Sequence, residues 1–286
     1  TTTKITLDKD VTQIPDMFRC YLEEYSVKEG NEHLKSIDGV LFSKDGVLLK
    51  YPAGKDGNEY VVPEGTKSIS ERAFADSKLT AIYLNSDLRE IDADAFKDCN
   101  DLVTLTMRIQ NNDVFVKDGF LWSGSTIIWY EGNQDVLIIP ECKRISHDAF
   151  KKKTPKVIVI PPSVHSDIYL YDKSIIISSS QDFSVFYEGN DWNYRIHRID
   201  LIYDTFFFST DGKTLTCTAG NWWSFAAEKI RTDDKNYVGP TVTFDVEELS
   251  KISYLSVIYQ PTKYEVIFET SGGPTVPSQD VYFRYR

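Results

Sequence analysis

A six-residue phrase that recurs along the chain limits its fold more than any other feature of the sequence. The phrase reads Ile-x-x-x-Ala-Phe and occupies residues 69–74, 91–96 and 145–150. Its first two copies begin 22 residues apart. A fixed period of this size is typical of stacked units that bury their apolar faces only against their neighbours. We therefore predict a repeat array, which favours a function in binding.

Short segments beside the phrase alternate between apolar and other residues, as does a β-strand with one buried face. Seven such segments occur, with the inward pairs Ile5/Leu7, Tyr25/Val27, Tyr60/Val62, Ile82/Leu84, Leu105/Met107, Leu137/Ile139 and Ile158/Ile160. The residues between the pairs face outward: Thr6, Ser26, Val61, Tyr83, Thr106, Ile138 and Val159. We predict one continuous parallel sheet of seven strands, with the Ile and Phe of the phrase on the far side of the core.

Two longer inserts, at 37–52 and 117–130, interrupt this pattern. Each has a tight turn, Asp45-Gly46 or Ser123-Gly124, between two apolar runs. This arrangement predicts a β-hairpin in each insert. Because both inserts lead to a strand that ends in proline, we interpret them as one module used twice.

These segments together resemble a known family. They are the phrase itself, the strand Leu79-Thr80-Ala81-Ile82-Tyr83-Leu84, the insert that begins Ile37-Asp38-Gly39-Val40-Leu41-Phe42, and Val62-Pro63-Glu64-Gly65. Over residues 4–165 the chain resembles the BspA-like leucine-rich repeats, also called the Treponema pallidum type. The resemblance implies a surface-exposed or secreted bacterial protein, and several members of the family are implicated in adhesion. The family has no catalytic residues that could be carried over.

The repeat pattern divides the chain into two predicted domains. Residues 1–203 form a leucine-rich repeat domain with a C-terminal cap, and the phrase is absent from residues 204–286. Short apolar runs separated by Gly and Pro in the second part predict an all-β, Ig-like sandwich of unknown family. The predicted fold is thus a right-handed solenoid with a parallel β ladder, mostly β with little helix, followed by that sandwich.

Composition excludes several classes of function. A net charge of −11 argues against nucleic acid as a partner, because phosphate contacts need clustered Lys and Arg. No apolar run reaches the length of a transmembrane segment. The chain begins at Thr1 without a methionine, so we expect that a native segment with a signal or a lipid anchor has been trimmed. Such a protein would be extracellular or on the bacterial cell surface.

Chemical motifs do not support an enzyme. The four histidines are isolated from each other and from any cysteine at metal-ligand spacing. The sequence has no glycine-rich phosphate loop and no nucleophile elbow. We therefore expect a protein that is not an enzyme and has neither metal nor cofactor.

The outward residues of the ladder provide the best candidates for a binding surface. An extended repeat surface suits a large partner, here a host or bacterial surface protein or a glycan. We predict that the partner-binding residues are Glu24, Ser26, Lys28, Tyr83, Thr106 and Arg108. The outward residues become apolar toward the end of the ladder, at Ile138, Val157 and Val159. We predict that the C-terminal domain packs there, and a partner site at the same place is the competing interpretation.

Two other functions remain open from the sequence. Trp222 and Trp223 are adjacent, so that one of them would be exposed on a strand and could stack on a sugar ring. The protein would then bind carbohydrate through its C-terminal domain. The third interpretation is a purely structural spacer.

Overall fold

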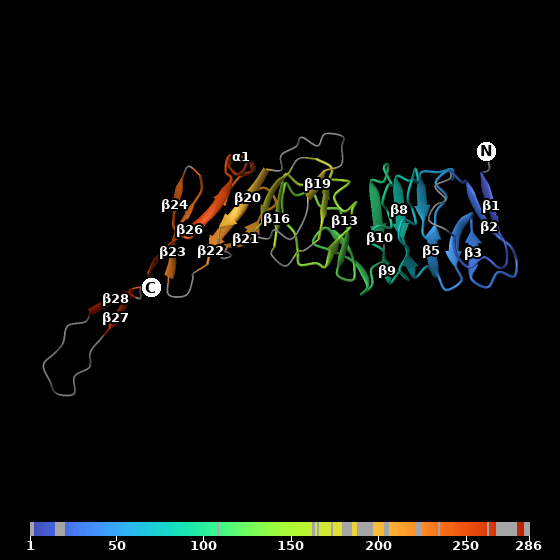
Figure 1. The fold of residues 1–286 in the computed structure, drawn as a ribbon, viewed down its shortest axis with the longest axis horizontal. Coiled ribbons are helices and arrows are strands. Elements are labelled where there is room, and N and C mark those ends of the chain that lie inside the picture. Colours follow the sequence, from blue (N-terminus) through green and yellow to red (C-terminus); the bar gives the residue numbers. More distant parts are fainter. Residues whose placement is uncertain are drawn as a thin grey trace, which may run out of the picture.

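The structure, a computed structural model, is an elongated stack of short β-strands that follow one another along the long axis in the order of the sequence (Figure 1). It describes residues 3–14, 21–107, 109–161, 164, 166–172, 174–178, 185–187, 197–202, 206–220, 225–233, 235–261, 263–266 and 279–282. The array agrees with the predicted mostly-β solenoid. Among the described residues the only α-helix is α1 (Val246–Leu249).

Parallel strands form a ladder along one side of the solenoid, in three stretches and not in the single continuous sheet predicted from the sequence. The first stretch consists of β1 (Lys4–Leu7) and β2 (Glu24–Val27). The second consists of β6 (Glu59–Val61), β8 (Ala81–Leu84) and β10 (Thr104–Met107). The third consists of β14 (Val136–Ile138), β16 (Val157–Ile160), β18 (Ile175–Ser178) and β20 (His197–Ile202). The breaks occur because the chain leaves the ladder after β2 and after β10 to build the two inserts.

Strands on the other side of the solenoid carry the isoleucine of the phrase. β7 (Ser68–Ile69) and β9 (Glu90–Ile91) pair in parallel, with Ile69 opposite Ile91. The third copy of the phrase begins on β15 (Arg144–Ile145), and further along the stack β17 (Ile168–Leu170) pairs with β19 (Val185–Tyr187). The phrase thus alternates with the ladder strand in each repeat, which encloses the core between them.

Each insert forms three antiparallel strands, whereas the sequence predicted a hairpin of two. The strands are β3 (Leu34–Ile37), β4 (Val40–Ser43) and β5 (Val47–Lys50) in the first insert, and β11 (Val114–Lys117), β12 (Phe120–Ser123) and β13 (Thr126–Tyr130) in the second. The additional turns are Asp38-Gly39 and Asp118-Gly119, whose residues all have positive φ between 48° and 80°. Positive φ at both central residues is the geometry of a type I′ hairpin turn. The last strand of each insert then pairs in parallel with a phrase strand, β5 with β7 and β13 with β15.

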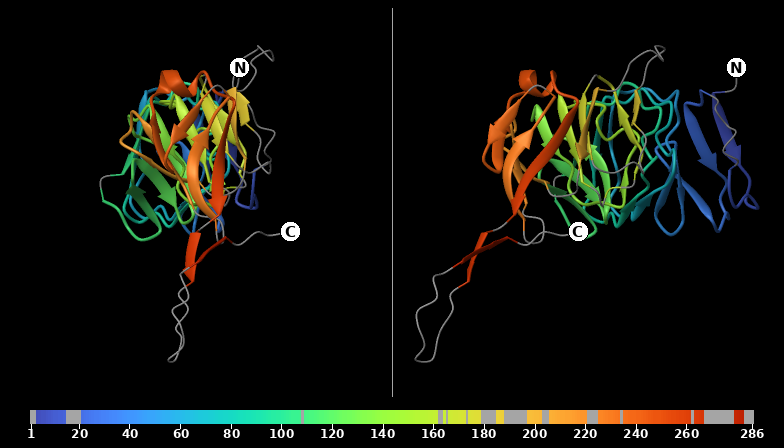
Figure 2. Two further views of the ribbon diagram at one scale, coloured as in Figure 1. Left: turned by 90° about the vertical axis from the view of Figure 1, so that its left-hand side faces the viewer. Right: turned by 60° about the vertical axis from the view of Figure 1, so that its left-hand side comes forward.

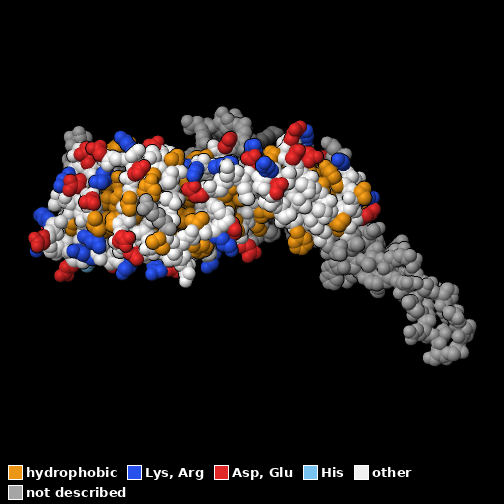
Figure 3. All heavy atoms as spheres, turned by 180° about the vertical axis from the view of Figure 1, so that it is seen from behind, with side chains coloured by type: hydrophobic (Ala, Val, Ile, Leu, Met, Phe, Trp, Pro, Cys, Tyr) orange, Lys and Arg blue, Asp and Glu red, His pale blue; other side chains and the backbone are white. Residues whose placement is uncertain are grey.

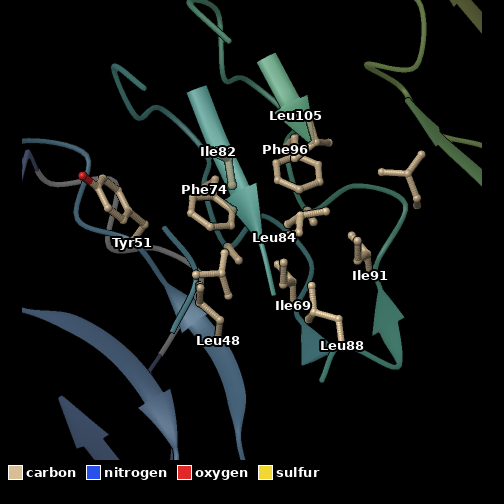
Figure 4. Packing of buried hydrophobic residues seen from close by; sticks show 14 of the residues in the cluster. Leu48, Tyr51, Ile69, Phe74, Ile82, Leu84, Leu88, Ile91, Phe96 and Leu105 are labelled. Atoms are coloured by element: carbon tan, nitrogen blue, oxygen red, sulfur yellow. The ribbon is translucent and has the colours of Figure 1, made fainter. Parts of the chain in front are cut away.

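Aromatic rings form the centre of the solenoid core. Phe74 and Phe96 stack with ring centroids 5.5 Å apart, and both side chains are fully buried. Tyr51 continues this row at 5.8 Å from Phe74 (Figure 4). In the later part of the stack, Phe150 packs at 5.8 Å from Tyr130. Each insert therefore supplies a tyrosine next to the phenylalanine of the following phrase, and the aromatic row is preserved despite the change in backbone.

The ladder continues into the C-terminal region. β20 pairs in parallel with β26 (Tyr254–Pro261), which is followed in the same sheet by β23 (Phe225–Arg231) and β24 (Asn236–Val238). A second sheet consists of β21 (Phe206–Thr210), β22 (Leu215–Ala219) and β25 (Thr241–Phe244). The hairpin of β27 (Lys263–Val266) and β28 (Gln279–Tyr282) extends away from the stack (Figure 2). The predicted Ig-like sandwich is not confirmed, since the described strands divide between the end of the ladder and the three-stranded sheet.

Candidate functional site

The second stretch of the ladder has a partly exposed outward face. Two rows of outward residues cross its strands in register, Val61, Tyr83 and Thr106 in one row and Glu59, Ala81 and Thr104 in the other. We call these six residues the middle face. Val61 is 68% exposed, whereas Tyr83 and Thr106 are half-buried. An exposed aliphatic side chain beside a tyrosine and threonines gives the mixture of apolar contact and hydrogen bonding that protein interfaces use.

The predicted partner-binding residues Glu24, Ser26 and Lys28 lie apart from the middle face, on and beside the two-stranded sheet of β1 and β2. Glu24 accepts hydrogen bonds from Lys4 Nζ at 2.7 Å and from Ser26 Oγ at 3.1 Å. Lys28 Nζ lies 2.8 Å from a carboxylate oxygen of Asp8. The structure therefore divides the predicted set into two groups, and the N-terminal charges are paired within the protein.

Hydrogen bonding also sets the charge of these N-terminal carboxylates. The hydrogen bond from Lys4 is the main cause that lowers the pKa of Glu24 below its ordinary value, and Ser26 adds to it. In the same way, Lys28 lowers the pKa of Asp8. Both carboxylates are exposed, so such pairs contribute little to folding stability. They reduce the free charge that this end of the ladder offers to a partner.

The outward face of the third stretch is covered by the protein itself. Val157 and Val159 are buried and belong to one hydrophobic cluster with Leu215 and Cys217 of β22. Ile138 is half-buried and packs against the same cluster. The backbone N–H of Val136 also donates to the carbonyl of Gly212, in the turn between β21 and β22. The three residues singled out as a domain interface thus contact the region that follows the repeats.

Three of the predicted site residues, Arg108, Trp222 and Trp223, lie outside the described residues. Within the described part of the chain, no group of three or more His, Cys, Asp or Glu is placed to hold a metal ion. The same part has no helix with the length and hydrophobicity of a membrane span. On the face shown in Figure 3, acidic and basic side chains are intermixed, with hydrophobic side chains between them.

Three cysteines in the described residues are free. Burial raises the pKa of Cys99 and of Cys217 to about 12, and that of Cys142 to about 11. A thiol that keeps its proton at neutral pH is a poor nucleophile and a poor metal ligand. These side chains therefore act as small core residues.

Three asparagines with a structural role were not recognised from the sequence. Asn31, Asn85 and Asn111 each follow a ladder strand and lie three residues before a buried Leu or Val. In each case Oδ1 accepts two backbone N–H groups of the next turn, and Nδ2 donates to a carbonyl of the preceding repeat. The recurring Asn-x-x-Leu/Val pattern was the available signal. Such bonds satisfy backbone groups at the bend where strands end.

The repeating ladder, the phrase strands and the shared core define a leucine-rich repeat solenoid. Residues 56–167 match, in six copies, the family described as the BspA type leucine rich repeat region. The repeats at residues 56–167 are thus of the BspA type. A search of curated proteins gives no significant match.

Three solved structures of bacterial proteins are similar to the chain. The pneumococcal vaccine antigen PcpA is 24% identical, with 65% of this chain and 56% of that chain covered and a TM-score of 0.39. A leucine rich cell surface protein from Faecalibacterium prausnitzii is 21% identical, with coverages of 66% and 48% and a TM-score of 0.39. A leucine-rich repeat protein from Eubacterium ventriosum is 16% identical, with coverages of 68% and 61% and a TM-score of 0.38. The chain spans less than two thirds of the length of each of these proteins.

Proposed function

We propose that the protein is a noncatalytic recognition protein, extracellular or on the bacterial cell surface, which binds a protein partner through the middle face. The observation that carries the proposal is the 68% exposure of Val61 beside Tyr83 on a rigid, in-register sheet. Elsewhere in the ladder, outward apolar residues are covered by β21, β22 and β25. Val61 and the neighbouring half-buried Tyr83 together give the middle face an apolar contact surface, and contiguous apolar surface often marks an interface.

The middle face also has the rigidity that recognition requires. Its three strands are hydrogen-bonded to each other along their length, and their inward residues Ile82 and Leu105 are buried in the core. A partner that docks there loses little conformational entropy from this side of the interface. Extended repeat surfaces of this kind suit partners much larger than a small molecule.

Binding of the purified chain to a panel of host extracellular proteins tests the proposal. Val61→Glu and Tyr83→Ala are expected to weaken binding by about tenfold or more, because each removes apolar contact from the centre of the face. Val238→Glu is the matched control, since Val238 is 86% exposed on β24 and lies outside the middle face. Binding that is unchanged by both Val61→Glu and Tyr83→Ala would contradict the proposal. If the chain binds only glycans and the same variants lose that binding, the middle face is still the binding site but its partner is a glycan.

A further inference from the structure

A hollow lies where the second insert brings distant parts of the solenoid together. The third copy of the phrase returns to contact the second copy, although some fifty residues separate them in the sequence. Arg144 Nη2 lies 2.7 Å from Asp94 Oδ2, and the Ser146 hydroxyl donates to the carbonyl of Ala93. A hollow of about 350 Å3 opens beside this contact. This volume lies at the lower end of the range of small-ligand pockets.

The charges around the hollow are mixed, with an excess of cations. Lys97, Lys143 and Arg144 face it together with the carboxylates of Asp94 and Asp167. Arg144 is paired with Asp94. Neither Lys97 nor Lys143 has an ion pair with any residue that the structure describes. Two unpaired ammonium groups in a protein of net charge −11 offer a specific attraction to an anionic ligand.

An aromatic wall and a hydroxyl complete the lining. The rings of His147 and Tyr169 pack with centroids 3.9 Å apart and both line the hollow, as does Ser166. Nδ1 of His147 is buried without a hydrogen-bond partner among the described residues, and lies 3.6 Å from Oδ1 of Asp148. Asp148 itself is held by the Tyr171 hydroxyl at 2.7 Å. The mutual packing of the two rings gives the hollow a continuous aromatic wall, with the carboxylate of Asp148 close behind His147.

We propose that this hollow binds a carboxylate-bearing saccharide. The ligand carboxylate pairs with the ammonium groups of Lys97 and Lys143, and sugar hydroxyls donate to carboxylate oxygens of the lining. The ring packs its C–H face on the aromatic wall, which has an apolar surface with polar edges. The acceptors Asp94 and Asp167 would repel a densely charged polyanion, but they suit a ligand that has many hydroxyl donors and one negative charge.

This inference rests on the proposed recognition function but uses the phrase side of the solenoid, whereas the middle face belongs to the ladder. The two sites can therefore be separated by experiment. Val61→Glu should leave saccharide binding unchanged, and variants of the hollow should leave protein binding at the middle face unchanged. Loss of saccharide binding in Val61→Glu would overturn the assignment of the site to the hollow.

Calorimetric titration of the full chain with N-acetylneuraminic acid and methyl glucuronide provides the test, with neutral lactose and a glutamate-rich peptide as the other probes. The double variant K97Q/K143Q should lose about tenfold or more in affinity for an acidic sugar, because both charge-assisted contacts are removed. K44Q/K67Q is the control, since it removes the same charge at exposed lysines outside the hollow. Binding to the acidic sugar should also weaken as salt rises, because Lys143 is exposed to solvent.

Several outcomes would overturn the proposal. These are the absence of acidic-sugar binding at millimolar concentration, equal binding of lactose, stronger binding of the peptide, and unchanged affinity in K97Q/K143Q. Tyr169→Ala gives an independent check on the aromatic wall, and it should weaken binding of both acidic sugars. Thermal melts of each variant establish that the fold is intact. Lysine-to-glutamine changes at these surface positions should leave the melting temperature close to that of the wild type.

Discussion

The second and third stretches of the ladder are built from the same alternating strands, yet one outward face is exposed and the other is buried. Val61 on β6 is 68% exposed, whereas Val159 on β16 is 1% exposed. The inward residues are buried in both apart from the partly buried Tyr60, so the repeat core does not decide this difference. It depends on whether β21, β22 and β25 lie over the strand. Whether an outward valine is exposed in this fold therefore depends on whether another sheet packs over its strand.

The largest effect is expected when a charge is placed on the covered face. Val159→Asp should lower the free energy of unfolding by about 4 kcal/mol or more, because an unpaired carboxylate would be buried among the side chains of β22 and β25. Denaturant titration of the variant measures this loss. Val159→Ile, which keeps the surface apolar, should cost much less. A stability equal to that of the wild type for Val159→Asp would show that the cover separates readily from the ladder.

A smaller effect is expected at Asp148, a buried carboxylate in the third copy of the phrase. Burial alone would raise the pKa of Asp148, but its contacts with His147, Tyr171 and Lys151 outweigh burial and hold the pKa below its ordinary value. Asp148→Asn should cost about 2 kcal/mol at neutral pH, because Lys151 is left buried without its carboxylate.

The lowered pKa of Asp148 also predicts a dependence of stability on pH. A lowered pKa in the folded state adds stability above the ordinary aspartate pKa of about 4, and this contribution is lost as the pH falls through the folded value. The wild type should therefore lose stability more steeply than Asp148→Asn below about pH 4. Denaturation midpoints between neutral pH and about pH 2 measure both slopes, and parallel curves would contradict the role of Asp148.

The smallest effect on stability is expected on the exposed face. Val61→Asp should change the free energy of unfolding by about 0.5 kcal/mol or less, because the side chain is mostly in water in the folded protein. The loss in the free energy of unfolding should then be several kcal/mol larger for Val159→Asp than for Val61→Asp, although both strands belong to the same ladder. A large loss of stability in Val61→Asp would mean that the middle face is covered in the folded protein.

The sequence predicted the stacking and the core correctly, because both follow from a strict period. Phe74 and Phe96 occur at equivalent places in the phrase, and they stack in the structure. The breaks in the ladder could not be predicted from alternation, because Val27 and Tyr60 show the same pattern whether or not their strands are neighbours. The extra turn at Asp38-Gly39 was readable, since Asp-Gly is a hairpin signal, but the strand before it contains Lys35 and Ser36 and does not stand out as an apolar run.

The candidate sites were less accessible to prediction. The outward residues are polar at the start of the ladder, at Thr6 and Ser26, and apolar at its end, at Ile138 and Val159. This change of polarity indicated a covered surface at the end of the ladder, where the structure places β21, β22 and β25. The contact between Arg144 and Asp94 had no signal in the sequence, because the second insert separates the two residues and interrupts the repeat period. Pairing of Lys4 with Glu24 follows from the register of β1 and β2, in which Ile5 and Leu7 lie opposite Tyr25 and Val27, as the alternation had aligned them.

The parallel pairing of β20 with β26 has a consequence for synthesis on the ribosome. β26 begins at Tyr254, well after β20 ends at Ile202. The edge of β20 that pairs with β26 therefore remains unpaired while the intervening chain is translated. The covering strands β21, β22 and β25 lie in this intervening chain, so the valines and isoleucines of the third stretch stay exposed on the nascent chain until these strands are made. Truncations that end between these two strands should therefore be prone to aggregate, and chaperones that shield β-rich intermediates should matter most at this stage of translation.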